Sequence, residues 1–236
     1  MNTAKLISYT QPAPNSNIEG VENAQDLVAY MARVSNPDNQ NNKKTSKKLL
    51  DYLAKNAHWS PFEMVHATME IETTRDIARQ ILRHRSFTFQ EFSQRYADPT
   101  KAFKNSEAFC VRETRMQDPK NRQSSIEIEN DPAIQLNARQ QELITDFQRR
   151  QHGIIKQAED VYKWAVENGI AKEQARAVLP EGLTRTRLYM AGSLRSWLHF
   201  VSLRSKNGTQ KEHSIVAIAC AKELEPVFEN IMQYTV

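Results

Sequence analysis

Residues 64–96 read MVHATMEIETTRDIARQILRHRSFTFQEFSQRY. Apolar and polar residues alternate as far as Ile71, which predicts a strand with one buried face over residues 64–72. The two threonines that follow are suited to capping a helix, and we expect that helix to run to about Arg83. The rest of the stretch is predicted to leave the helix and continue as a loop.

This loop mixes charged, polar and aromatic side chains within a short length. Its charged and aromatic members are Arg83, His84, Arg85, Phe87, Phe89, Glu91, Phe92 and Arg95. Arginine forks suit phosphate and carboxylate oxygens, and aromatic rings stack on planar ligands. A solvated basic loop is the alternative, but such a loop does not need three phenylalanines beside its charges. The mixture favours a site for an anionic, planar, nucleotide-like ligand.

Outside this stretch the same patterns predict further strands and helices. Strands are expected at residues 5–10, 107–116 and 183–190, and helices at 24–34, 46–55, 132–167, 171–178 and 193–203. The long helix is expected to break near Gly153, and a last helix is expected to start from a capping box at 209–212 and to break at Pro226. Neither a repeat nor a flexible linker divides residues 1–236. We therefore expect one α+β domain, with a mainly antiparallel sheet packed by helices.

The composition is that of a soluble globular protein. The 236 residues are 39% hydrophobic and 25% charged, and the net charge of +4 favours anionic partners. The apolar runs are too short to span a membrane, and the N-terminus has no apolar signal core. We expect a cytoplasmic protein without a membrane partner.

Several kinds of site find no support in the sequence. Cys110 and Cys220 have neither a disulfide framework nor zinc-ligand spacing, so both are expected to be buried structural thiols. No histidine pair has metal-ligand spacing, so we expect no metal site. The six glycines form neither a dinucleotide-binding loop nor a P-loop, so arginine side chains would have to hold any phosphate.

A second basic group lies toward the C-terminus. It comprises Arg176, Arg185, Arg187, Arg195, His199 and Arg204. Arg195 and His199 share one face of the predicted helix, and that face could line a pocket. For this helix alone, an ordinary amphipathic helix with its polar face in water is the favoured interpretation. His213, an isolated histidine on the last helix, is interpreted as structural.

The spacing from Arg83 to Ser93 resembles a family signature. Arg83-His84-Arg85, seven further residues and then Ser93 is similar to the RHR-x(7)-S pattern of the flavin-dependent thymidylate synthases. Further segments resemble the same family, and they cover nearly the whole chain: 32–35, 58–63, Gln80, 88–96, 176–180, 193–204, Gln210 and Glu212.

The resemblance implies that dUMP is methylated to dTMP. It implies 5,10-methylenetetrahydrofolate as the carbon donor and FAD, reduced by NADPH, as the source of hydride. It also implies a homotetramer whose active sites are each built from several subunits. No cysteine nucleophile is needed, which agrees with the setting of the two cysteines.

The resemblance also implies roles for individual residues. For dUMP these are Gln80, Ile81, Leu82, Arg83, Glu91, Phe92, Ser93, Gln94, Arg95, Arg176 and Arg204. Residues 91–95 would come from a neighbouring subunit, with Ser93 and Arg95 at the phosphate, and Arg204 would be catalytic at the pyrimidine. For FAD the implied residues are Ser60, Arg83, His84, Arg85, Glu91, Ser193, Leu194, Arg195 and His199.

The chain departs from the family pattern at Ser193, where many members have asparagine. The segment 117–131 carries no motif that can be assigned. Two other functions are kept as alternatives: a nucleic-acid-binding module that uses the Arg/Phe-rich loop, and a flavin oxidoreductase with another substrate. The folate-binding residues, the choice between NADPH and NADH, and a cellular or phage origin are left open by the sequence.

Overall fold

A computed structural model describes residues 2–16, 18–103, 108–128, 138–206, 208–229 and 231–234. Its centre is a four-stranded sheet in the order β1-β2-β6-β3, in which all neighbouring strands are antiparallel. The strands are β1 (Thr3–Tyr9), β2 (His66–Thr74), β3 (Thr88–Glu91) and β6 (Arg185–Ser193). The expected α+β fold with an antiparallel sheet is confirmed.

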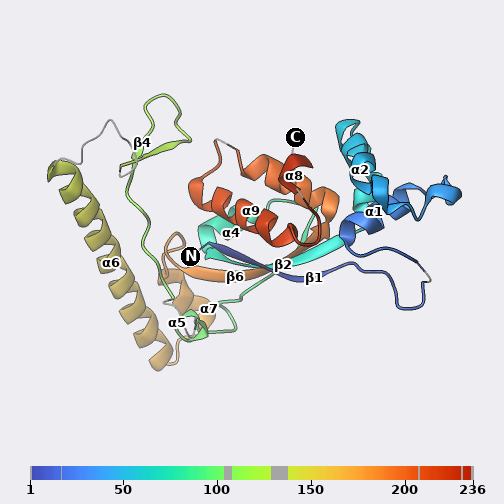
Figure 1. Ribbon diagram of the computed structural model, residues 1–236. Coiled ribbons are helices and arrows are strands. Elements are labelled where there is room, and N and C mark those ends of the chain that lie inside the picture. The colour runs from blue at the N-terminus through green and yellow to red at the C-terminus, as the bar shows by residue number, and fades with distance from the viewer. Residues whose placement is uncertain are drawn as a thin grey trace.

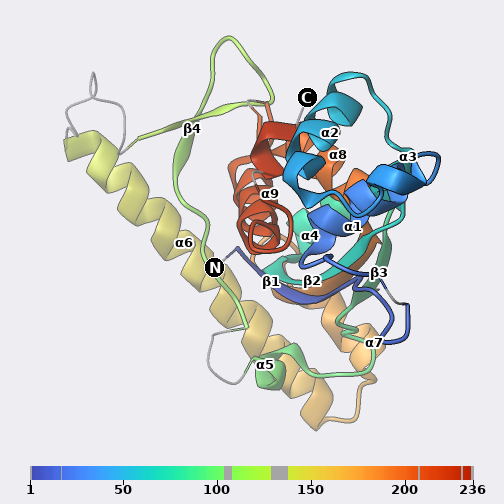
Figure 2. The same ribbon diagram turned by 45° about the vertical axis from the view of Figure 1, so that its right-hand side comes forward.

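Most of the helices gather on one face of this sheet (Figures 1 and 2). The longer ones are α1 (Ala24–Ala32), α2 (Ser46–Lys55), α4 (Arg75–Ile81), α6 (Ala138–Glu167), α8 (Leu194–Arg204) and α9 (Lys211–Leu224). The short ones are α3 (Ser60–Glu63), α5 (Pro99–Ala102), α7 (Lys172–Ala175) and the 3-10 turns η1 (Pro37–Asn39), η2 (Lys43–Thr45), η3 (Arg176–Val178) and η4 (Ile231–Tyr234). Helices α4, α8 and α9 pack against the strands, and α1 to α3 lie together at one end, whereas α5, α6 and α7 do not lie on this face.

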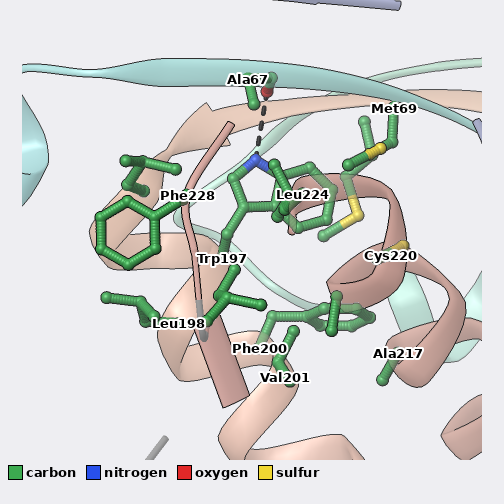
Figure 3. Packing of buried hydrophobic residues seen from close by; sticks show 14 of the residues in the cluster. Ala67, Met69, Trp197, Leu198, Phe200, Val201, Ala217, Cys220, Leu224 and Phe228 are labelled. Carbon is green, nitrogen blue, oxygen red and sulfur yellow. Dashed lines mark hydrogen bonds between the residues drawn. The ribbon is translucent and has the colours of Figure 1, made fainter. Parts of the chain in front are cut away.

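The alternation that predicts the central strand also produces the core. Val65, Ala67, Met69 and Ile71 are all buried beneath the helices, although β2 begins two residues later than expected. Trp197 of α8 packs among these residues, and its indole N–H donates to the carbonyl of Ala67 at 3.1 Å (Figure 3). This bond satisfies the one polar atom of a fully buried indole, so α8 is fixed on the sheet.

Strand β3 replaces part of the predicted loop. Phe87 and Phe89 alternate with polar residues, and their side chains pack on the core while Thr88 and Gln90 are exposed. This period of two lets the backbone pair with β6 as an edge strand. The prediction of a loop throughout this stretch was therefore wrong.

The predicted strand at 107–116 is also largely wrong. Phe109 makes only an isolated bridge with Thr184, and the nearest strand is the short β4 (Arg115–Gln117). That strand pairs with β5 (Ser125–Glu127), which lies inside the segment 117–131 that could not be assigned from sequence. Residue 107 and residues 129–131 lie outside the described residues.

Helix α6 is continuous over 30 residues, so the break expected at Gly153 was wrong. A glycine inside a helix costs only about 1 kcal/mol, which the surrounding turns offset. The expected residues 132–137 lie outside the described residues. In both views α6 stands apart from the helices that cover the sheet (Figures 1 and 2).

The start of α9 differs from the predicted capping box. Gln210 is its N-cap residue and makes no side-chain capping bond, because the Gln210 amide donates to Glu212 instead. The carboxylate of Glu212 accepts from Arg115 at 2.6 Å. Helix α9 ends at Leu224, two residues before Pro226, as predicted.

Cys220 is buried and Cys110 is only partly buried, so the expectation of a buried thiol is confirmed for Cys220 alone. Among the described residues, no helix is long and apolar enough to cross a membrane. In the same part of the chain, no group of three or more His, Cys, Asp or Glu side chains is placed to hold a metal ion.

Candidate functional site

The C-terminal end of α4 gathers one set of predicted site residues, which we call the α4-end cluster: Gln80, Arg83, His84 and Arg204. Helix α4 ends at Ile81, and the chain then turns through Arg83 and His84. Arg204, the last residue of α8, donates from Nε to His84 Nε2 at 3.0 Å. The fold thus joins the two basic groups that are separated in sequence.

His84 is a neutral acceptor in this cluster. Its Nε2 receives the Arg204 proton, and its ring meets the edge of Phe200 at a centroid distance of 5.0 Å. Burial, and then the charge of Arg204, lower the pKa of His84 to about 4. Burial and the nearby Arg83 also lower the pKa of Arg204, but a guanidinium remains protonated at neutral pH. The neutral imidazole of His84 therefore fixes the direction of the cationic guanidinium of Arg204.

The low pKa of His84 predicts that the protein loses stability in mild acid. Burial also lowers the pKa of His213 to about 3, whereas an unfolded histidine titrates near 6.5. Between about pH 6.5 and 4 the unfolded chain therefore binds more protons, and stability falls as the pH falls. The slope is at most about 1.4 kcal/mol per pH unit for each histidine, and less for His84, which is only partly buried.

Urea unfolding across this pH window measures the slope. The His213→Asn variant removes one of the two titrations, so its stability should depend less steeply on pH. A wild-type stability that is constant across the window would contradict the prediction.

The start of α8 gathers a second set, the α8-start cluster: Ser60, Glu63, Arg85, Ser193, Arg195 and His199. Ser193 is the N-cap of α8, where its hydroxyl accepts from Ser196 N at 3.3 Å and donates to Glu63. Arg195 Nε lies 3.6 Å from Glu63, and Ser196 Oγ donates to Ser86 O at 3.3 Å. These bonds hold α3 and the turn that carries Arg85 against α8.

His199 lies one turn further along the exposed side of α8. Its ring meets that of Trp59 edge-on at a centroid distance of 5.0 Å. Burial, and then the charge of Arg195, lower the pKa of His199 from its ordinary value. The predicted shared face of Arg195 and His199 is therefore present, and it borders α3.

The far end of β3 forms a third set around a pocket of about 490 Å³. We call it the β3 pocket, and its lining includes Glu91, Phe92, Ser93, Phe103, Arg187 and Tyr189. Phe92 packs against Phe103 at 5.7 Å, and Ser93 is exposed. Arg95, just beyond, is paired with Glu173 at 3.1 Å on the surface.

The carboxylate of Glu91 already has bonding partners within the chain. This carboxylate accepts from Thr186 at 3.0 Å and pairs with Arg75 at 3.3 Å and Arg79 at 3.6 Å. Arg75 begins α4, and Arg79 lies in its last turn, four residues before Arg83. Glu91 thus contacts both turns of α4, whereas Arg95 pairs with Glu173 of α7.

Some of the predicted site residues have side chains that are buried or half-buried. Ile81, Leu194, Ser193 and Gln94 are at most 4% exposed. The amide N–H of Leu194 is also used, because it donates to Val65 O at 2.7 Å. Leu82 is half-buried as the cap of α4, and Arg176 is half-buried in η3.

Sequence reasoning missed Arg75 and Arg79 and assigned no role in the site to His213. The two arginines are four residues apart on one helix face, a spacing that could have marked them as a pair. The partner Glu91 comes from a strand that was predicted as loop, which hid the interaction. No local signal marks His213, because its contacts come from α4 and α8.

The α8-start cluster, together with Arg83 of the α4-end cluster, fits an anionic cofactor. Arg83 and Arg85 are exposed, and neither side chain forms an ion pair or hydrogen bond with any described residue. Two free guanidinium forks on one turn, beside the exposed Arg195 and His199 face of α8, suit a diphosphate. The residues present therefore fit a nucleotide cofactor of the FAD type, except Ser193 and Leu194, whose polar groups are already used.

Comparisons with known proteins find similar sequences over most of the chain. Residues 16–230 match the family described as thymidylate synthase complementing protein. A probable flavin-dependent thymidylate synthase of Paramecium bursaria Chlorella virus 1 is 44% identical over 97% of this chain and 96% of its own. A flavin-dependent thymidylate synthase of Synechocystis is 44% identical over 92% of each chain.

One solved structure supports the fold. It is a crystal structure of PolB from Streptomyces cacaoi, described as a UMP/dUMP methylase bound with 5-Br dUMP. The likeness has a TM-score of 0.75 at 23% identity and covers 99% of this chain and 94% of PolB.

Proposed function

The chain belongs to the flavin-dependent thymidylate synthase family, which converts dUMP to dTMP, and from that premise we propose how its residues divide the reaction. The carbon donor is 5,10-methylenetetrahydrofolate, and FAD reduced by NADPH supplies the hydride. The observation that carries the proposal is the turn at Arg83–Arg85, whose two free guanidinium groups lie beside α8. We assign the enzyme to the cytoplasm, either of a cell or of a phage-infected host.

The nucleotide is bound by two sets of residues. Gln80, Arg83 and Arg204 of the α4-end cluster meet dUMP, together with the backbone of Ile81 and Leu82. Ser93 and Arg95 at the β3 pocket hold its phosphate, with Arg176 in support. Arg95 is available because its pair with Glu173 is exposed, and such a pair contributes little stability.

The cofactor is bound by the α8-start cluster together with Arg83 and His84 of the α4-end cluster. Arg83, Arg85 and Arg195 hold the diphosphate, with Ser60, His84 and His199 beside them. When bound, FAD carries the hydride that reduces the transferred one-carbon unit. Ser193 acts through the cap of α8 and through Glu63 rather than by touching FAD, because its hydroxyl is buried and already bonded. Glu91 likewise acts by orienting Arg75 and Arg79.

The chain activates the pyrimidine without a thiol. Burial raises the pKa of both Cys110 and Cys220, so neither is a ready thiolate. Arg204 instead places a cation beside the base, where it stabilises negative charge that develops on the ring. His84 fixes the direction of that guanidinium.

We propose a homotetramer with shared sites. Helix α6 presents five apolar side chains, each between 41% and 59% exposed: Leu143, Phe147, Ile154, Val161 and Trp164. Three of them recur every seven residues, which gives a seam along the helix. An exposed seam of this kind, on a helix that stands apart from the core, favours burial against another copy.

Flavin binding tests the proposed function. Purified protein is expected to take up FAD and to show flavin absorbance. The Arg85→Ala variant should weaken that binding about 10- to 100-fold, because a charge-assisted bond to phosphate is lost. Arg149→Ala, which removes an exposed arginine on α6, is the matched control and should bind FAD as the wild type does.

Absence of flavin binding under all conditions would contradict the proposal. Strongly salt-dependent binding of DNA or RNA instead would favour the nucleic-acid-binding alternative. Flavin binding without any conversion of dUMP would favour the oxidoreductase alternative.

A further inference from the structure

His213 on α9 is fully buried between α4 and α8. Its Nδ1 lies 3.2 Å from Gln80 Oε1, while its Nε2 is buried without a hydrogen-bond partner among the described residues. Its ring packs against His84 at 6.1 Å and Phe200 at 5.8 Å. A buried histidine that bonds a nucleotide-binding glutamine has a use beyond packing.

A line of hydrogen bonds continues from this glutamine to a carboxylate. Gln80 Nε2 donates to Gln210 Oε1 at 2.8 Å, and Gln210 Nε2 donates to Glu212 Oε2 at 3.0 Å. Glu212 also accepts from Arg115 at 2.6 Å, with Arg112 at 3.5 Å. Burial raises the pKa of Glu212, but the Arg115 bond and the two arginine charges outweigh it and lower that pKa.

The charge on Glu212 fixes the direction of every bond in this line. A carboxylate only accepts, so Gln210 must turn its NH2 group toward Glu212 and its oxygen toward Gln80. Gln80 must then present its NH2 group to Gln210 and its oxygen to His213. His213 must therefore carry its proton on Nδ1. Burial and nearby charges lower the pKa of His213 to about 3, so the ring is neutral and can hold this single tautomer.

We propose that His213 is a positioning residue for dUMP, which with Glu212 locks the side-chain amide of Gln80 in one orientation. An amide has two hydrogens and two oxygen lone pairs. Two of these four groups are used inside the chain, so one N–H and one lone pair of the half-buried Gln80 remain in fixed places for the nucleotide. The inference rests on the proposed function, because it takes Gln80 to contact dUMP.

Neutron diffraction from crystals of the wild-type protein tests the orientation directly. Deuterium is expected on Nδ1 of His213 and absent from its Nε2. The deuterated side-chain amide nitrogen of Gln80 is expected to face Gln210. Deuterium on Nε2 alone, or an inverted Gln80 amide, would overturn the proposal. This result does not depend on whether the protein binds dUMP.

Binding measurements test the consequence. His213→Leu removes the donor, and we expect dUMP affinity to fall about 3- to 10-fold while FAD affinity stays unchanged. His213→Asn keeps an N–H near the Nδ1 position and should restore dUMP affinity. Unchanged dUMP affinity in the leucine variant, or no restoration by asparagine, would refute the positioning role. A wild-type protein that binds no dUMP would instead refute the proposed function, leaving the neutron result to decide the orientation.

Discussion

Replacing Arg204 by alanine is expected to lower the kcat for dTMP formation about 100- to 1,000-fold, because the substitution removes a cation aimed at developing charge. The guanidinium is held before substrate arrives, since His84 Nε2 accepts from its Nε at 3.0 Å. Its position at the end of α8 is fixed by the core around Trp197. A preorganised charge of this kind needs no rearrangement at the moment of reaction, which is why its loss affects kcat.

The control is Arg204→Lys, which keeps the charge but loses the planar fork. It should retain more activity than alanine and less than the wild type. Circular dichroism should be unchanged in both variants, because Arg204 is the last residue of α8 and lies outside the buried core. An alanine variant that retains more than about a third of wild-type kcat would show that Arg204 is not the electrostatic group assigned here.

The sequence could predict those parts of the fold that local pattern controls. The alternation before Ile71 marks the central strand, and Ser193 marks the start of α8, where the structure shows its hydroxyl capping the helix. The pairing of β3 with β6 could not be predicted, because an edge strand depends on a partner a hundred residues away. The continuity of α6 through Gly153 was missed because neighbouring turns outweigh a weak local preference.

The candidate site shows the same division. The segments that carry Arg83, Ser93 and Arg204 could be identified from the spacing of residues. The spacing could not predict which of these residues lie close together within one chain. Arg204 bonds His84 directly, whereas Glu91 pairs with Arg75 and Arg79. The network of Gln80, Gln210 and Glu212 was likewise hidden, because the bonded pair Gln80 and Gln210 lies 130 positions apart in sequence.

The separation of the two sets has a consequence for catalysis. Arg83 and Arg204 lie beyond the last turn of α4, where Arg204 bonds His84, whereas Arg95 follows β3 and pairs with Glu173 of α7. One nucleotide meets both sets most simply when they come from different copies of the chain. Burial of the exposed apolar seam on α6 favours association of the copies.

Co-expression of an Arg204→Ala chain with an Arg95→Ala chain is therefore expected to restore dTMP formation that each variant alone lacks. In mixed assemblies, a site that takes Arg204 from one chain and Arg95 from the other is intact. Random association should restore about one quarter of wild-type activity. The measurement is the rate of dTMP formation by assemblies that are purified through different tags on the two chains.

The matched control pairs Arg204→Ala with Arg83→Ala. Both residues belong to the α4-end cluster of a single chain, since Arg83 is next to the histidine that bonds Arg204. No chain in that mixture carries both arginines, so no site is complete and activity should stay low. Restoration in neither mixture, despite confirmed mixed assemblies, would show that each site is built within one chain. Equal restoration in the two mixtures would show that Arg83 and Arg204 also come from different chains, which would contradict the single α4-end cluster. Restoration in the first mixture alone requires that Arg95 reaches across an interface, because no arrangement within one chain can combine the two intact residues.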